Sequence, residues 1–540
     1  MTLSRREFLK ALGATAGAAA VVDLIDGPFW SVEPLEAAPL GAAELKSLSG
    51  VALDRARQLG CSYADIRINR YRNRTVSLRS SPDRSAGMTG GRVLHVPGVI
   101  ETGSFGFGVR VLHSGCWGFA ASSRVGKDEI ARVTAQAAAI AKANSAMGGR
   151  PIQLAPVPAY QDRYVTPFTK DPFEVSIQDQ LALLQSIHEA AKKVPGVMSV
   201  NSGLVFRTED KYFASTEGSH IQQLIMQSGP TFAATAVDFA TRKSKSRSFQ
   251  VKPVTGGWEH VESCGMLEAA ERLGQEAVEH LSAPPVNPGV KDLVLMPSHL
   301  GLTIHESIGH STELDRVLGY EANFAGTSFL APPEKMMGQF QFGSKIVNVV
   351  GDRTLPGAMS TVGYDDDGVK ATRWHILKDG VFMAYQTIRD QAHRVGETES
   401  RGCCYADSFD SIPFQRMPNV WLEPGPDGTS LDDLISQVED GILIDGRGSY
   451  SIDQQRYNFQ FGGDAFWEIK HGKRGAMIAD VAYQSRTQDF WNSCAAIADQ
   501  RHWENVGLNN DGKGQPSQTN AMSHGCSPAL FRRVNVLRTE

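Results

Sequence analysis

Cysteine is scarce in this sequence, and no Cys-x-x-Cys pair occurs. Only seven cysteines are spread over 540 residues, and two of them, Cys403 and Cys404, are adjacent. The lack of Cys-x-x-Cys argues against a thiol redox motif or a zinc ribbon. Adjacent cysteines bond to each other only with strain. One or two disulfides elsewhere stay open, but a chain of this length can build its core without them.

Long apolar runs and basic runs are also missing. No apolar stretch reaches the roughly 20 residues that a membrane-spanning helix needs, so we expect no membrane span. The net charge is -5 and lysine and arginine are not clustered, so we expect no nucleic-acid partner. What is present is the composition of an ordinary globular protein, with 41% hydrophobic and 21% charged residues. The length predicts more than one domain.

The first residues carry a targeting pattern. Residues 4–22, SRREFLKALGATAGAAAVV, place Arg5 and Arg6 before Phe-Leu-Lys and a weakly hydrophobic run of alanine and glycine. This pattern resembles a twin-arginine export signal, and an amphipathic first helix is the alternative. Cleavage after Ala20 and cleavage at the later Glu-Ala-Ala-Pro of 36–39 both stay open. We expect the mature chain to be periplasmic or otherwise exported.

Hydrophobic periodicity divides the chain into two predicted domains. Helical spacing predicts helices over 41–59, 127–146, 176–194 and 261–282, and alternation predicts hairpins over 62–80 and 103–123 with further strands over 198–251. The first hairpin is expected to turn at an Asn-Arg pair. Three prolines in 283–289 mark a boundary. We therefore predict an α+β fold: a signal segment at 1–38, an N-terminal domain with an antiparallel sheet and helices at 39–288, and a mostly β C-terminal domain at 289–540.

The stretch GLTIHESIGHSTELD, residues 301–315, contains the main candidate site. His305 and His310 flank Glu306, but they are five residues apart, whereas the zinc-protease motif His-Glu-x-x-His has them four apart. Five residues correspond to about 140° around an ordinary helix, too far for both imidazoles to reach one ion. A π turn would bring them together, and Gly309 weakens the helix at that point. The alternative is a buried helix with two unrelated histidines.

The segment also resembles the signature of the TldD/PmbA family of metallopeptidases, His-Glu-x-x-Gly-His-x-x-Glu-x-Asp. The matching residues are His305, Glu306, Gly309, His310, Glu313 and Asp315. Further segments such as FGFGVRVL and SFDSIPFQRMPNVWLEPG are similar to family segments in the family's order, over nearly the whole mature chain. The resemblance implies a zinc-dependent peptidase acting on peptides or unfolded polypeptide, with His305 and His310 as ligands and Glu306 as general base. It also implies a homodimer or a heterodimer with a related subunit.

Two points are open after this comparison. Glu313 and Asp315 are either helix-end charges or groups that orient a ligand histidine. The second point is the third ligand, because the family's Cys-Gly-Lys segment is Asp511-Gly512-Lys513 here.

We predict Asp511 as the third ligand, since two histidines and an acid form a common hydrolytic zinc set. The harder carboxylate also makes iron or manganese less improbable than a thiolate would. Cys526 and His524 are alternative donors, and residues 509–514 would also make a good loop without any metal. The missing cysteine favours one alternative function: a non-catalytic partner or peptide-binding subunit that keeps the family fold.

Overall fold

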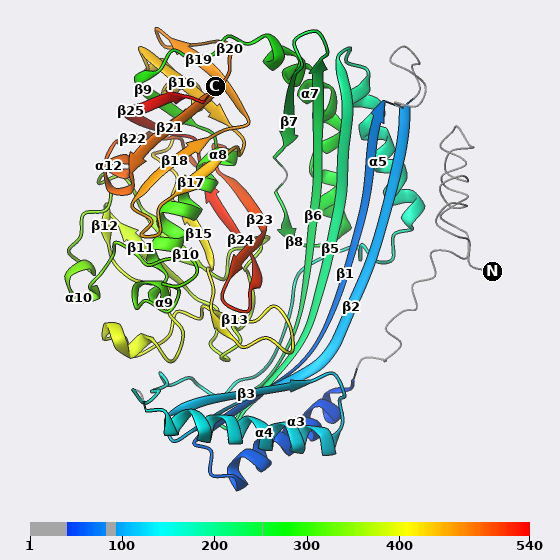
Figure 1. Ribbon diagram of the computed structural model, residues 1–540, viewed down its shortest axis with the longest axis vertical. Helices are drawn as coiled ribbons and strands as arrows, with labels where there is room; N and C mark the ends of the chain where they lie inside the picture. The colour runs from blue at the N-terminus through cyan, green and yellow to red at the C-terminus, as the bar shows by residue number, and fades with distance from the viewer. Residues whose placement is uncertain (1–39, 83–92, 149, 251, 540) are drawn as a thin grey trace.

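The structure is a computed structural model that describes residues 40–82, 93–148, 150–250 and 252–539 (Figure 1). It has the predicted α+β class, with two large sheets and smaller ones beside them. The predicted twin-arginine segment lies outside the described residues, and the division into domains at 288/289 stays a prediction. No helix of the described part is both long and apolar enough to cross a membrane. All seven cysteines lie in the described part and are free thiols there.

An eight-stranded sheet forms the N-terminal half of the molecule. Its strand order is β3-β2-β1-β5-β6-β4, and β7 and β8 also pair with β6. The strands are β1 (Tyr63–Pro82), β2 (Val93–His113), β3 (Cys116–Ser122), β4 (Gln161–Val165), β5 (Val197–Ser215), β6 (His220–Asp238), β7 (Lys243–Phe249) and β8 (Val254–Thr255). Figure 1 shows β1, β2, β5 and β6 running side by side along the molecule as one long, curved wall.

The prediction of a hairpin over 62–80 is wrong, because β1 is one continuous strand of 20 residues. It pairs with β2 along one edge and with β5 along the other, straight through the expected turn. There, Asn73 lies opposite Thr102 on β2 and Arg207 on β5. The buried Arg74 donates to the carbonyls of Pro172 and Phe173. Its guanidinium therefore has hydrogen-bond partners although Arg74 lies in the middle of a strand. Pairing on both edges therefore overrides the local turn preference.

Helices cover this sheet in two places. They are α3 (Ala42–Gln58), α4 (Lys127–Ala146), α5 (Ile177–Lys192), α6 (Trp258–Ser263) and α7 (Met266–Ser282). The helices α3 and α4 pack on the lower end of the sheet in Figure 1, and α5 and α7 pack on one face of its upper part. The predicted helix over 261–282 is interrupted, because Gly265 has φ 77° and ends α6 before α7 begins. The apolar stripe of α5, including Leu184 and Ile187, is buried against the sheet.

The C-terminal half is mostly β, as predicted. A nine-stranded sheet has the order β17-β18-β21-β25-β9-β16-β19-β20, with β22 also paired to β25. Its strands are β9 (Gly289–Leu295), β16 (Asp440–Asp445), β17 (Tyr450–Ile452), β18 (Asn458–Gly462), β19 (Ala465–Lys470), β20 (Lys473–Ile478), β21 (Val481–Arg486), β22 (Cys494–Ile497) and β25 (Ala529–Arg538).

Smaller sheets and short helices complete this half. The sheets are β12-β11-β10-β15, β13-β14 and the hairpin β23-β24. Their strands are β10 (Val349–Asp352), β11 (Arg373–Lys378), β12 (Val381–Phe382), β13 (Cys404–Tyr405), β14 (Phe414–Gln415), β15 (Asn419–Leu422), β23 (Glu504–Lys513) and β24 (Gln518–Cys526). The helices are α8 (Pro297–Ile304), α9 (Leu314–Val317), α10 (Pro333–Met336), α11 (Leu431–Ser436) and α12 (Thr487–Asn492).

Ion pairs with buried cations join the two halves. Arg110 on β2 contacts Asp367 at 2.6 Å, and Lys211 on β5 contacts Asp366 at 2.7 Å. Arg247 on β7 contacts Asp445 at 2.6 Å. The hairpin β23-β24 lies between the long sheet and the rest of the C-terminal half (Figure 1). The fold thus places β23, the strand that carries Asp511, between the long sheet and the rest of the C-terminal half.

Candidate metal centre

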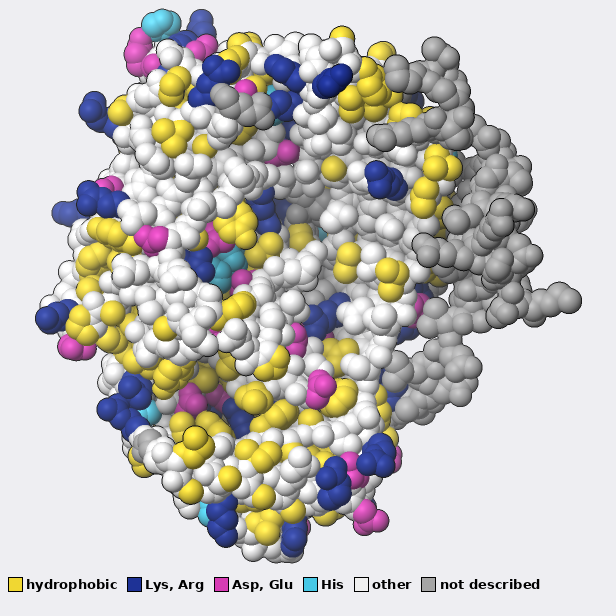
Figure 2. Space-filling view, in the orientation of Figure 1, with side chains coloured by type: hydrophobic (Ala, Val, Ile, Leu, Met, Phe, Trp, Pro, Cys, Tyr) yellow, Lys and Arg dark blue, Asp and Glu magenta, His cyan; other side chains and the backbone are white. Residues whose placement is uncertain are grey.

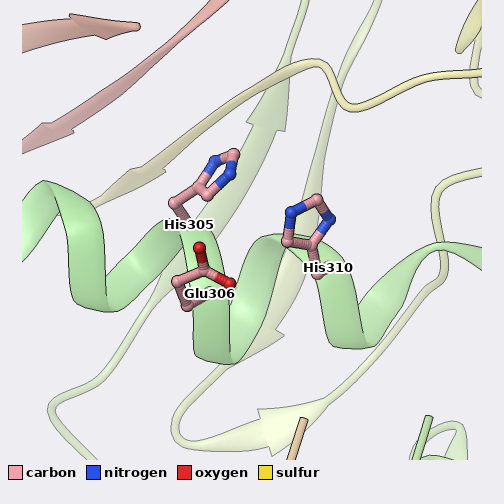
Figure 3. Close-up of side chains that lie close together, drawn as sticks. All are labelled: His305, Glu306 and His310. Carbon is pink, nitrogen blue, oxygen red and sulfur yellow. The ribbon is translucent and has the colours of Figure 1, made fainter. Parts of the chain in front are cut away.

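The two histidines of the motif meet because the helix changes its pitch between them. After α8 the chain makes a π-helical turn over His305–Gly309 and then a 3₁₀ turn over His310–Thr312. The ring centroids of His305 and His310 are consequently only 4.5 Å apart. Figure 3 shows both rings rising from the same side of the helix, with Glu306 beside them. This is the distortion that the five-residue spacing requires.

Local contacts stabilise the π turn. Gly309 lies so close to Met417 that a Cβ atom there would be 2.6 Å from the sulfur, so glycine permits the packing. Gln386 donates from Nε2 to the Gly309 carbonyl at 2.6 Å. The hydroxyls of Ser311 and Thr312 bond to carbonyls four residues earlier, a contact that bends helices. The carbonyls of Ser307, Ile308 and Gly309 therefore each accept a hydrogen bond from a side chain.

Asp511 lies opposite both imidazoles. Its Oδ1 is 3.6 Å from His305 Nε2 and 3.5 Å from His310 Nε2. Donor atoms bound to one tetrahedral zinc at about 2.0–2.2 Å are roughly 3.3–3.6 Å apart. The spacing of the two nitrogens from the carboxylate oxygen therefore fits a single zinc-sized ion.

The other ring nitrogens have partners that leave both Nε2 atoms free to coordinate. The carbonyl of Val420 accepts from His524 Nδ1 at 3.1 Å, so His524 Nε2 is an acceptor. That nitrogen is 2.8 Å from His305 Nδ1, which must donate to it. Burial and then the nearby His305 lower the pKa of His524 well below its usual range, which keeps it neutral. His310 Nδ1 donates to Glu313 at 2.9 Å.

Three acceptors therefore face one another: two imidazole lone pairs and the Asp511 carboxylate. Arg416 donates to the Asp511 carboxylate at 3.3 Å, which favours its ionised form. Burial lowers the pKa of His310, which disfavours a protonated ring there. A cation at this point would satisfy all three groups, and the residues fit a divalent metal.

Glu313 and Asp315 are both buried, and Glu313 orients a histidine because it accepts from His310, whereas Asp315 contacts Lys513 and neither histidine. Besides His310, Glu313 accepts from Arg316 at 3.1 Å and from Lys513 at 3.0 Å. Burial raises the pKa of Glu313, but Lys513 and Arg316 hold it well below its usual range. Lys513 also contacts Asp315 at 2.8 Å. Because Lys513 is two residues from Asp511, this network fixes the predicted ligand relative to the helix.

Glu306 has a partner that sequence reasoning missed. Arg456, in the turn between β17 and β18, donates from Nη1 to Glu306 Oε2 at 2.8 Å. The oxygen or nitrogen atoms that His305, Glu306 and His310 can offer lie within 4.8 Å of one another. Nothing in the sequence around Arg456 signals this contact, which joins residues 150 positions apart.

The two alternative donors, His524 and Cys526, lie at different positions relative to the candidate centre. His524 contacts His305 through the nitrogen that does not face Asp511. Cys526 is fully buried, and its sulfur contacts the carbonyl of Pro297 at 3.7 Å. It does not line the cavity at the histidines.

A cavity of about 640 Å³ opens in front of these groups. Its wall includes His305, Glu306, His310, Asp511 and His524, together with Arg447 and Arg456. A second cavity of about 490 Å³ shares Arg447, Leu508 and Asn510 with it and is walled on its other side by β5 and β6. Figure 2 shows histidine, acidic and basic side chains side by side on the C-terminal half of this face. His305, Glu306, His310 and Asp511 are only 5–6% exposed, so the site is reached through this cavity, and the long sheet borders the neighbouring one.

Comparison with known sequences gives the family. A sequence model described as "PmbA/TldA metallopeptidase C-terminal domain" matches residues 288–536, and "PmbA/TldA metallopeptidase domain 1" matches residues 97–141. Together they cover more than half of the chain. A metalloprotease from Methanocaldococcus jannaschii is 26% identical over 435 residues, which are 79% of this chain and 88% of that protein. A zinc metalloprotease TldD homolog from Saccharolobus solfataricus is 21% identical over 399 residues, 73% of this chain and 79% of the homolog.

Solved structures share the fold. The crystal structure of TldE from Thermococcus kodakarensis superposes with a TM-score of 0.67 at 15% identity, covering 92% of this chain and 100% of TldE. At that identity the likeness concerns the fold alone.

Proposed function

Because the chain belongs to the PmbA/TldD family of metallopeptidases, we propose that it is an exported, zinc-dependent peptidase that hydrolyses peptides or unfolded polypeptide. One observation carries the proposal: the Nε2 atoms of His305 and His310 face the same oxygen of Asp511 at 3.6 and 3.5 Å, at the wall of an open cavity. The names of its relatives support zinc as the ion.

His305, His310 and Asp511 would hold the ion, and Glu306 would act on the proton. Bound there, zinc would supply Lewis acidity toward the scissile carbonyl and the attacking water. Glu306 takes the proton of that water through one carboxylate oxygen and passes it to the leaving amine. Arg456 holds the other oxygen at 2.8 Å and so fixes the carboxylate. We assign the ligand role to Asp511 because its Oδ1 is nearly equidistant from both imidazoles.

Location and assembly are part of the same proposal. The paired Arg5 and Arg6 with the alanine-rich run behind them support export through the twin-arginine pathway into the periplasm. The family resemblance supports a dimer, formed by two copies or with a related subunit. Light scattering of the purified protein would give its mass in solution, and a monomer would contradict the dimer.

The test of the catalytic assignment is a pair of variants with metal analysis. We expect about one zinc per chain in the purified protein and none in the double variant His305→Ala, His310→Ala. Glu306→Gln should keep the ion and lower peptide hydrolysis by about 10²–10⁴-fold, because an amide does not accept the proton of water.

Glu334→Gln is the matched control, since Glu334 is exposed on α10 and should keep the wild-type rate. Wild-type activity of Glu306→Gln would remove Glu306 from the mechanism. A protein that holds no metal and cleaves no peptide would instead favour the non-catalytic partner subunit.

The export proposal has its own test. Replacing both Arg5 and Arg6 with lysine should leave the protein in the cytoplasm, because the twin-arginine pathway is selected by that pair. Cell fractionation of a bacterial host measures the result, and an unchanged periplasmic amount would show that another signal directs the chain.

A further inference from the structure

Two arginines line the cavity at the histidines, and only one of them has an acidic partner. Arg456 is paired with Glu306 at 2.8 Å. Arg447, which follows β16, donates from Nη2 to the carbonyl of Gly507 at 2.8 Å. Its Nε is buried and has no hydrogen-bond partner. Within the described residues no aspartate or glutamate forms an ion pair with it.

Most buried arginines of the described part pair with an acid, although Arg353 is also buried without an ion pair. Arg247 contacts three carboxylates, Arg316 contacts Glu313, and Arg389 contacts Glu217. Burial lowers the pKa of Arg447, and no neighbouring carboxylate raises it again. Keeping a guanidinium half-buried without a counter-charge costs free energy, which a bound anion would offset.

Arg447 lies close to the metal-binding residues. Its partner Gly507 follows Val506, which is opposite His524 in the β23-β24 hairpin. His524 in turn contacts His305 at 2.8 Å. Arg447 also lines the second cavity, which the long sheet borders. A group bound by Arg447 would therefore lie in the approach to the candidate centre.

We propose that Arg447 is a specificity-determining residue that binds a carboxylate of the substrate, so that peptides with a negative charge at one side of the scissile bond are preferred. The inference rests on the proposed peptidase function. If the substrate is a peptide, the anionic groups that it can offer to Arg447 are carboxylates. The planar guanidinium can offer the donors that Gly507 leaves free to such a group as a charge-assisted pair. The carboxylate can belong to the C-terminus of the peptide or to an Asp or Glu side chain.

Two pairs of quenched fluorescent peptides distinguish these sources. In the first pair all side chains are neutral, and the peptide ends either in a free carboxylate or in an amide. Versions of this pair place the C-terminus one to four residues beyond the cleaved bond. The second pair ends in an amide and carries one Glu or one Gln at those positions. We expect kcat/KM to be at least about tenfold higher for the charged member of one pair, the effect of one charge-assisted hydrogen bond. The pair that responds identifies the source.

Variants then assign the preference to Arg447. Arg447→Gln should bring the ratio within the responding pair close to 1, and Arg447→Lys should keep part of it because the charge remains. Arg132→Gln is the matched control, since Arg132 is exposed on α4, and it should keep the wild-type ratio. If Arg447→Gln does not fold, Arg447→Lys carries the test through its reduced ratio. Equal rates within both pairs in the wild type, or a preference that survives in the folded variants, would overturn the inference.

Failure of the proposed function gives a different result. In that case no peptide is cleaved by the zinc-loaded protein. The affinities of the same peptides, measured by calorimetry, then decide the role of Arg447 by the same ratios: a tenfold preference lost in Arg447→Gln supports it, and equal affinities contradict it.

Discussion

At the scale of single residues, the properties of the candidate centre depend on which atom of each side chain is left free. His524 and Glu313 engage the Nδ1 atoms of His305 and His310, so both Nε2 atoms face Asp511. Such partners fix the tautomer and the ring orientation of a metal-binding histidine. Asp511 itself is held by Arg416, which donates to its backbone carbonyl and, at 3.3 Å, to its side chain. The donor set is therefore arranged before any ion binds.

Asp511 is the residue at which this chain departs from the family, and its removal should weaken metal binding. Asp511→Ala should lower zinc affinity by more than the 10–100-fold that is typical for the loss of an outer partner. Asp511→Cys should restore much of it, since a thiolate is also a zinc ligand. Competition with a coloured chelator measures both. Asp410→Ala, at an exposed position, should keep the wild-type affinity. Unchanged affinity in Asp511→Ala would remove Asp511 from the ligand set.

The sequence could predict the residues of the site better than their contacts. The residue types of His305, Glu306 and His310, together with the resemblance to the family signature, indicated a metal site, and the Gly-Lys pair after Asp511 pointed to the strand that the fold brings beside them. Arg456 and Arg447 were missed, because their contacts with Glu306 and Gly507 join distant segments and leave no local pattern. Cys526 was a reasonable donor by distance along the chain, yet β24 carries its side chain toward Pro297.

At the scale of elements, one π turn decides whether the two histidines meet. The turn follows α8 directly and ends at Gly309, whose carbonyl is bound by Gln386. Its position could be predicted because a five-residue spacing is incompatible with an ordinary helix. The single strand β1 could not be predicted, because the residues that pair with its middle are distant in sequence: Asn73 lies opposite Thr102 on β2 and Arg207 on β5. Local turn preference therefore misled where long-range pairing decides.

The contact between Gly309 and Met417 gives a test of the π turn. A Cβ atom at 309 would lie 2.6 Å from Met417 Sδ and 2.7 Å from Cε. Gly309→Ala should therefore lower the free energy of unfolding by about 1–3 kcal/mol, the usual cost of overpacking. Met417→Ala alone should cost about 2–5 kcal/mol through the space it leaves.

The double variant should lose less unfolding free energy than the two single variants lose together, because the added methyl group fills part of the space that Met417→Ala leaves. Urea unfolding of the four proteins measures the cycle. Strict additivity would mean that Gly309 is needed for another reason than this contact.

At the scale of the whole molecule, the candidate centre depends on two halves held in one arrangement. The cavity that adjoins it has β5 and β6 on one side and residues 507–510 on the other. Buried charges cross the boundary: Arg110 contacts Asp65 in its own sheet at 2.7 Å and Asp367 in the other half at 2.6 Å. Removing one partner of a buried pair leaves the other charge without compensation, so such contacts oppose separation of the halves.

Asp367→Asn should measure how strongly the halves are coupled. Because Arg110 keeps Asp65, we expect the free energy of unfolding at pH 7 to fall by about 1–3 kcal/mol, the range for a charged hydrogen bond. Asp54→Asn is the control, since its pair with Arg57 is exposed and should contribute less than about 1 kcal/mol. Burial raises the pKa of Asp367, but Arg110 and Arg389 hold it below its usual range.

The sign of the pH dependence follows from that lowered pKa. The wild-type advantage over Asp367→Asn is fully present above the unfolded pKa of about 3.9 and is lost as the pH falls through the lower pKa of the folded protein. Urea unfolding monitored by tryptophan fluorescence at pH 7 and at about pH 3 should therefore show the difference shrinking in acid. If the substitution uncouples the halves, the single transition will separate into two. Equal stabilities at pH 7 would show that other contacts hold the halves together.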